Sequence, residues 1–299
     1  MPVFRPEPYT RRIETTNGTI ALEVALRRFV PVGRGIGTSE VWLVGVTHLG
    51  TSNYYARLQQ FLDRQDLVLF EGIGAKNKQF RSTQSEGFSL QPALAKALGL
   101  RFQLTTINYD QPRWENSDLS VAELIRRLPP DQETGGFKQL MAVFDGEGAL
   151  GGIAKLGVSL LALSPRLQAS AKLMLIETLG GFDGQMPDTT ELGFDTKELL
   201  RVLIEERNAV VVRDLRAALK ESHLIHRIAV FYGAGHMVDL EHRLRQELAL
   251  VPVEDQWLRA FGVNPERAGL TQFEVETIRD AVQSELGTSK TAPSPAATK

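Results

Sequence analysis

The stretch Val41-Trp42-Leu43-Val44-Gly45-Val46-Thr47-His48 decides how this sequence is interpreted. A short run of apolar, β-forming residues leads into Gly45, and a histidine follows three residues later. Such a run, bounded by glycine, is typical of a buried strand that ends at a turn. Residues 228–232 repeat the pattern, because they lead into Gly233-Ala234-Gly235-His236. The two Gly-x-x-His units therefore predict two buried strands that each lead to a histidine.

Further apolar runs alternate with helical patterns along the chain. Strands are predicted at 41–44, 67–70, 101–107, 228–232 and from 249 to 253; helices are predicted at 51–64, 90–98, 196–221, 238–248 and 273–286. The first part has the order β-α-β-α-β with short connections, which favours parallel strand pairing. We therefore predict an α/β fold with a mixed, largely parallel central sheet flanked by helices.

Residues 1–286 are predicted to form a single α/β domain, with a helical insertion at about 119–195 that caps the site. The apolar stretch 148–180 belongs to this insertion. A membrane-surface or partner-binding helix pair is the alternative for that stretch, because its apolar face is broad. Residues 287–299 are rich in Thr, Ser, Pro, Ala and Lys, and we predict a disordered tail.

Composition excludes several classes of function. The formal net charge is −2, so no strong positive field would attract nucleic acid. The chain has no cysteine, which excludes disulfides, thiolate metal sites and cysteine nucleophiles. The N-terminus has no apolar signal region, and no stretch is long and apolar enough to cross a membrane. We therefore expect a cytoplasmic protein without membrane association or nucleic-acid partners.

His48 and His236 are the first candidates for chemistry. Ligands of open α/β sheets bind beyond the carboxyl ends of the strands, where both histidines are predicted to lie. Gly45 and Gly233 would let the backbone turn sharply or approach a ligand closely. Backbone hydrogen bonds that simply satisfy the two imidazoles are the structural alternative. For the other three histidines, which lie on or near predicted helix ends, we favour a structural role; they are His223, His226 and His242.

Glu71 is the third candidate, because it follows the apolar run 67–70. An acid at the end of a buried strand is costly unless it faces a site or a partner. It could ligate a metal ion or act as a general base on water. A structural ion pair is the alternative.

Weaker candidates surround these three residues. Tyr109 follows the predicted strand at 101–107, and Asp118 could cap the helix after it. Arg207 and Asn208 interrupt an otherwise apolar helix pattern. Arg207 could hold Glu71 or stabilise a developing oxyanion, and a solvated helix charge is its alternative. Tyr109 and Asn208 are predicted to support the site.

The motifs resemble those of the TraB/GumN family. The resemblance spans roughly residues 40 to 261 and is carried by the segments 41–52 (VWLVGVTHLGTS), 68–72 (VLFEG), 206–208 (ERN), 230–237 (VFYGAGHM) and 257–261 (WLRAF). That family includes the TraB/PrgY proteins and is related to the Tiki metalloproteases. It belongs to a wider group with the haem-binding ChaN proteins and the erythromycin esterases.

The resemblance implies an α/β core with a helical insertion and a site formed by His48, Glu71 and His236. For the Tiki branch it implies divalent-metal-dependent peptide hydrolysis. The chain departs from that branch because it has no evident export signal or membrane anchor.

We therefore expect a metal-dependent hydrolase that acts on a peptide or a small molecule. His48 and His236 would supply nitrogen ligands, and Glu71 would be a ligand or the base. Such a mixed site suits Mn²⁺, Co²⁺ or Zn²⁺. Two alternatives stay open: a metal-independent esterase-like hydrolase with His48 as base oriented by Glu71, and a protein that binds haem or a peptide without turnover.

Overall fold

The computed structural model describes residues 8–33, 39–72, 90–127, 157–181, 201–221 and 225–286 of the 299-residue chain. The predicted tail at 287–299 and much of the predicted insertion lie outside these ranges. The described parts of the insertion are helical, at α4 (Val121–Arg127), residues 157–163 and α7 (Pro165–Gly180). In the described ranges, no helix is both long enough and apolar enough to cross a membrane.

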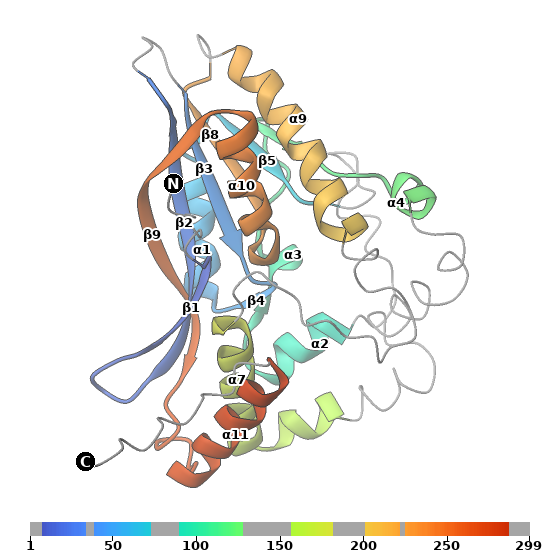
Figure 1. The fold of residues 1–299 in the computed structure, drawn as a ribbon. Coiled ribbons are helices and arrows are strands. Elements are labelled where there is room, and N and C mark those ends of the chain that lie inside the picture. The colour runs from blue at the N-terminus through green and yellow to red at the C-terminus, as the bar shows by residue number, and fades with distance from the viewer. Residues whose placement is uncertain are drawn as a thin grey trace, which may run out of the picture.

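Seven strands form the central sheet within the described residues (Figure 1). They are β1 (Thr10–Glu14), β2 (Ile20–Pro31), β3 (Glu40–Val46), β5 (Leu67–Phe70), β7 (Trp114–Asn116), β8 (Arg227–Gly233) and β9 (Leu250–Val263). Strands β3, β8, β5 and β7 pair side by side in parallel, whereas β2 is antiparallel to β1, β3 and β9. The predicted α/β fold with a mixed, largely parallel sheet is confirmed.

The position of β8 between β3 and β5 determines which residues the sheet edge can bring together. Val46 at the end of β3 pairs with Gly233, and Phe70 at the end of β5 pairs with Phe231. Because the three strands are parallel and nearly level, their carboxyl ends meet at one edge. The residues directly after β3, β5 and β8 therefore lie close to one another.

Helices cover both faces of the sheet, and successive strand residues alternate between the two resulting cores. One core joins Leu43 and Val230 to α9 (Arg207–Lys220) and α10 (Met237–Glu247). The other core joins the opposite side chains of the same strands to α1 (Ser52–Leu62), α7 and α11 (Gln272–Glu285). Burial on both faces explains the continuous apolar runs 41–46, 67–70 and 228–232 in β3, β5 and β8.

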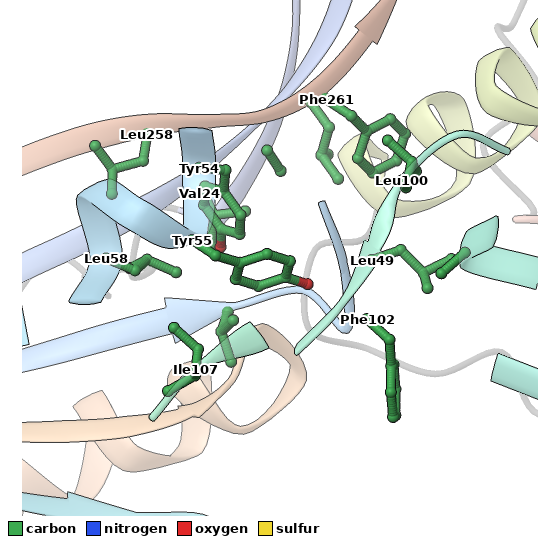
Figure 2. Packing of buried hydrophobic residues seen from close by; sticks show 14 of the residues in the cluster. Val24, Leu49, Tyr54, Tyr55, Leu58, Leu100, Phe102, Ile107, Leu258 and Phe261 are labelled. Carbon is green, nitrogen blue, oxygen red and sulfur yellow. The ribbon is translucent and has the colours of Figure 1, made fainter. Parts of the chain in front are cut away.

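Figure 2 shows the second of these cores from close by. Tyr54, Tyr55 and Leu58 of α1 pack in one cluster with Val24 of β2 and Phe261 of β9. Helix α1 begins at Ser52 because the hydroxyl of the preceding threonine accepts a hydrogen bond from the backbone of Tyr54. This helix therefore fixes the chain directly after β3.

The strand predicted at 101–107 is wrong over most of its length. Only Arg101–Phe102 is extended, as β6, and it pairs with β4 (Leu49–Gly50) in a separate two-stranded sheet. The next four residues form a short helix, α3 (Gln103–Thr106). Its two threonines, β-formers by propensity, donate hydroxyl hydrogen bonds to the carbonyl of Phe102 and so favour a turn. In the central sheet, β7 takes the place next to β5.

A buried ion cluster joins the antiparallel part of the sheet to α10. Arg27 on β2 forms a two-pronged pair with Asp255 on β9, at 2.7 and 2.9 Å, and donates to Glu241 of α10 at 2.6 Å. The hydroxyl of Tyr9 donates to the same Glu241 oxygen at 2.9 Å. Arg27 is 3% exposed, so its charge depends on these partners rather than on water.

We expect Arg27→Leu to lower the free energy of unfolding by about 3–5 kcal/mol, because it removes the nearer cation from buried Glu241 and leaves it with the longer 3.4 Å contact to Arg245. Arg28→Leu is the matched control: Arg28 is the next residue on β2, is 30% exposed and pairs with Glu254, so its loss should cost about 1 kcal/mol or less. Urea unfolding followed by circular dichroism measures both. Equal losses in the two variants would contradict the structural role of the cluster.

Candidate functional site

Glu71 directly follows β5 and points along the sheet edge towards the end of β8. Its Oε2 accepts a hydrogen bond from the backbone N–H of Gly233 at 2.7 Å. A Cβ atom at Gly233 would lie 3.3 Å from this oxygen, a tight contact, so glycine permits the close approach that its position suggested. The side chain of Glu71 is 18% exposed, so it is largely enclosed by protein.

Arg207, the first residue of α9, holds Glu71 from the other side. Its Nη2 donates to Glu71 Oε1 at 2.6 Å and to Asp118 Oδ2 at 2.7 Å, and its Nε donates to Asp118 Oδ1 at 2.9 Å. Its Nη1 contacts the carbonyl of Leu203 and Nε2 of His236, both at 3.2 Å. These five acceptors match the five N–H groups of a guanidinium. All five N–H groups of Arg207 are therefore hydrogen-bonded, and its positive charge lies directly against Glu71.

The backbone before Arg207 is a π-helix, η2 (Arg201–Glu206). Helices of this kind are rare and appear mostly as short segments near functional sites. The helix predicted from 196 to 221 is therefore divided: η2 is wider than an α-helix, and α9 begins at the arginine that contacts Glu71.

Asp118 contributes more to the site than its expected role as a helix cap. Ser120 caps α4, since its Oγ accepts from the backbone N–H of Glu123 at 3.2 Å. The side chain of Asp118 is fully buried and pairs with Arg207. It also accepts from the backbone N–H groups of Gly72 at 3.0 Å and Leu119 at 2.7 Å. The predicted cap was wrong because the acid turns inward to a distant arginine instead of to its own helix.

His236 is buried, and its ring is held at both nitrogens. Nδ1 lies 2.8 Å from Oδ1 of Asn208. The amide nitrogen of Asn208 donates to Asp239 at 2.8 Å and to the carbonyl of His236 at 3.2 Å, so its oxygen is the atom left for the ring. A neutral His236 therefore carries its proton on Nδ1. Nε2 then accepts from Nη1 of Arg207, and it lies 3.6 Å from Oε1 of Glu71.

His48 follows β3 and is exposed. Its Nδ1 lies 3.0 Å from Oε1 of Gln103, and Nε2 of Gln103 donates to the hydroxyl of Tyr109 at 2.8 Å. The hydroxyl of Tyr55 donates to the carbonyl of Thr47 at 2.9 Å and so holds the residue before His48. The predicted pairing of His48 with Glu71 is thus replaced, at Nδ1, by an amide.

The charges around Glu71 keep it ionised. Burial by itself raises the pKa of Glu71, but the guanidinium of Arg207, followed by His236 and His48, outweighs that effect. The pKa of this carboxyl therefore lies well below its usual range.

The structure brings most of the predicted site residues to one sheet edge. Glu71, Arg207 and His236 are in direct contact, Asn208 holds His236, and Tyr109 reaches His48 through an amide. Gly45 is different, because a Cβ there would lie 3.1 Å from Val24 and 3.2 Å from the carbonyl of Ala25, so it serves the packing of β3 on β2. His226 and His242 are exposed elsewhere, and His223 lies outside the described residues.

Sequence reasoning missed Gln103 and Asp239. Gln103 lies in the stretch predicted as a strand, and nothing in its neighbours marks it as a partner of His48. Asp239 comes three residues after His236 and reads as an ordinary first-turn acid of α10. Its contact with Asn208 becomes visible only when α9 and α10 are placed together.

The described side chains do not fit a divalent metal ion as they lie. Among them, no group of three or more histidine, aspartate or glutamate side chains is arranged to hold one. The two candidate ligand atoms that lie closest, His236 Nε2 and Glu71 Oε1, both already accept from Arg207. A metal ion on these atoms would require the guanidinium to move away.

Comparison with known proteins gives no match: no protein-family model, no curated protein and no solved structure is similar enough to this chain to be significant. The resemblance to the TraB/GumN family therefore depends on the short motifs alone.

We expect Arg207→Lys to lower the free energy of unfolding by about 3 kcal/mol, because an ammonium cannot form the two-pronged pair with Asp118 and also reach Glu71. Arg213→Lys, at an exposed position of the same helix with a 70% exposed side chain, is the control and should change stability by less than about 0.5 kcal/mol. Chemical denaturation measures both. A fully stable Arg207→Lys variant would show that the two-pronged pair with Asp118 is not needed for stability.

The stabilisation by Glu71 should depend on pH in a defined direction. Because its pKa is lowered in the folded state, the contribution is complete above the unfolded value of about 4.3 and is lost as the pH falls below it. The free energies of unfolding of the wild type and Glu71→Gln should therefore differ most at neutral pH and converge in acid. Urea titrations at pH 7, 5, 4 and 3.5 test this, with exposed Glu266→Gln as control; a gap that stays constant would refute it.

Proposed function

We propose that this chain is a hydrolase that activates water at the carboxyl ends of β3, β5 and β8, with His48 as the general base. The observation that carries the proposal is the hydrogen bond from His48 to Gln103. It occupies Nδ1 of an exposed imidazole and leaves Nε2 as the proton acceptor, at the same sheet edge as the ionised carboxylate of Glu71.

In the proposed reaction, Nε2 of His48 removes a proton from water while the water oxygen attacks the carbonyl carbon of an ester or amide. The tetrahedral intermediate then expels the leaving group, which takes the proton back from His48. Glu71 supports both steps, because its fixed negative charge stabilises the imidazolium that forms between them. A low pKa suits this task, since the carboxylate keeps its charge throughout.

Arg207 is proposed to hold Glu71 rather than to meet the developing oxyanion. All five of its N–H groups have acceptors among the described residues. An oxyanion could recruit one of them only by displacing a bond that is already formed. Arg207 therefore acts on the reaction through the position and charge of Glu71.

The TraB/GumN resemblance supports the same class of reaction, with a peptide or a small molecule as substrate. The erythromycin esterases of the wider group are the relatives whose mechanism matches a site of this kind, a histidine base beside a glutamate. The proposed function thus follows the metal-independent alternative of the sequence interpretation, with Gln103 in place of Glu71 as the partner of Nδ1.

The proposal is tested with the purified chain on a panel of chromogenic esters and fluorogenic peptides, with and without chelator. His48→Ala should lower kcat/KM by about 10²–10⁴-fold, the usual contribution of a general base. His242→Ala removes another exposed histidine, on α10, and should leave kcat/KM unchanged. Chelation should have no effect.

Each other outcome points away from the proposal. Equal activity in the wild type and His48→Ala would remove His48 as the base. Absence of turnover across the panel, together with a Soret shift on titration with haem, would favour a binding protein.

A metal-dependent hydrolase is the second candidate, and one observation favours it. Both His48 and His236 have Nδ1 bonded to an amide oxygen, as is common for metal-ligating histidines, but Nε2 of His236 is in contact with Arg207. His48, His236 and Glu71 would hold Mn²⁺, Co²⁺ or Zn²⁺ only if Arg207 moved away, and the ion would then supply Lewis-acid chemistry. Activity that chelator abolishes and one of these ions restores would establish this candidate over the first.

A further inference from the structure

The two-stranded sheet β4–β6 brings Gln103 to His48. Leu49 pairs with Phe102 and Gly50 with Arg101, so the next pair of this antiparallel ladder is His48 with Gln103. The backbone N–H of Gln103 indeed donates to the carbonyl of His48 at 2.9 Å. This small sheet therefore fixes the two backbones against each other before the side chains meet.

The side chain of Gln103 makes a second connection to the same residue. It is 3% exposed, and its Oε1 lies 3.0 Å from Nδ1 of His48. Its Nε2 donates to the hydroxyl of Tyr109, a buried residue whose ring packs against Phe70 and Trp114 with centroids 5.1 and 5.7 Å apart. Because the amide nitrogen is engaged with a fixed hydroxyl, the oxygen is the end that faces the imidazole.

An amide oxygen can only accept a hydrogen bond, so a neutral His48 must carry its proton on Nδ1. A histidine in water prefers the opposite tautomer, with the proton on Nε2. We propose that Gln103 is a positioning residue that reverses this preference and holds neutral His48 as the Nδ1–H tautomer. The role of Gln103 in catalysis rests on the proposed function, whereas its effect on the tautomer of His48 does not depend on that function.

His236 provides an internal parallel on the neighbouring strand. Its Nδ1 faces Oδ1 of Asn208 at 2.8 Å, and the amide nitrogen of Asn208 is likewise engaged elsewhere. Nδ1 of each histidine thus faces a side-chain amide oxygen, which comes from α3 for His48 and from α9 for His236. Because His48 is exposed, water competes with Gln103 for Nδ1. The buried amide must therefore overcome the preference of a hydrated imidazole for the Nε2–H tautomer.

The test is the tautomer of His48, read from long-range ¹H–¹⁵N correlation spectra of the full chain labelled at histidine, at alkaline pH. Signals are assigned with His48→Ala. The wild type should show a protonated Nδ1 and an unprotonated Nε2. Gln103→Leu should move His48 to the Nε2–H tautomer, whereas Gln103→Glu, which keeps an acceptor in place, should retain Nδ1–H.

Gln65→Leu is the matched control, because Gln65 is another buried glutamine, 5% exposed, whose amide donates to the carbonyl of Phe61. It should leave the His48 spectrum unchanged. An Nε2–H tautomer in the wild type would overturn the proposal, and so would an unaltered tautomer in folded Gln103→Leu. If Gln103→Leu does not fold, a switch to Nε2–H in Gln103→Glu overturns it.

An activity measurement separates this inference from the proposed function. With an ester or peptide that the wild type hydrolyses, Gln103→Leu should lower kcat by about 10–100-fold with little change in KM, and Gln103→Glu should recover part of the loss. An unchanged kcat would remove the catalytic meaning of the contact. Absence of hydrolysis in the wild type would overturn the proposed function, while the tautomer measurement would still decide the role of Gln103.

Discussion

The buried guanidinium of Arg207 is the contact on which the candidate site depends. It joins Glu71 after β5, Asp118 after β7 and His236 after β8, three segments that are far apart in the sequence. A buried cation is costly unless every N–H has a partner, and here the partners come from all three segments. The same charge keeps Glu71 ionised despite its burial. Arg207 therefore determines both which segments meet at this sheet edge and the charge state of Glu71.

Local patterns were sufficient to predict the parts of the fold that are buried on both faces. The runs before Gly45, Glu71 and Gly233 are apolar, short and bounded by turn residues, so strands β3, β5 and β8 could be found from the sequence. Their parallel order then follows from the helices between them. Because carboxyl ends of neighbouring parallel strands share an edge, the meeting of Glu71 with His236 was predictable, and so was one of the roles weighed for Arg207.

The remaining parts depend on contacts that no local pattern contains. Thr105 and Thr106 have the propensity of a strand, but their hydroxyls bond to the preceding turn and make a helix. Asp118 stands where a helix cap is expected, and only the arrival of α9 gives it a different partner. Gln103 becomes a site residue through the register of a two-residue ladder. These are tertiary effects, and a single sequence carries no trace of them.

The two Gly-x-x-His units look equivalent in the sequence, but one imidazole is enclosed by protein and the other is open to solvent. Among the described residues, the imidazole after β8 is therefore shielded from water, whereas the imidazole after β3 is accessible to it. On the proposed function, water and substrate both approach His48 from its exposed side, so the planar carbonyl group presents one of its two faces to the attacking oxygen. The tetrahedral intermediate would then form with one handedness, set by the strand order, and an ester with a stereocentre beside its carbonyl would be hydrolysed with preference for one enantiomer.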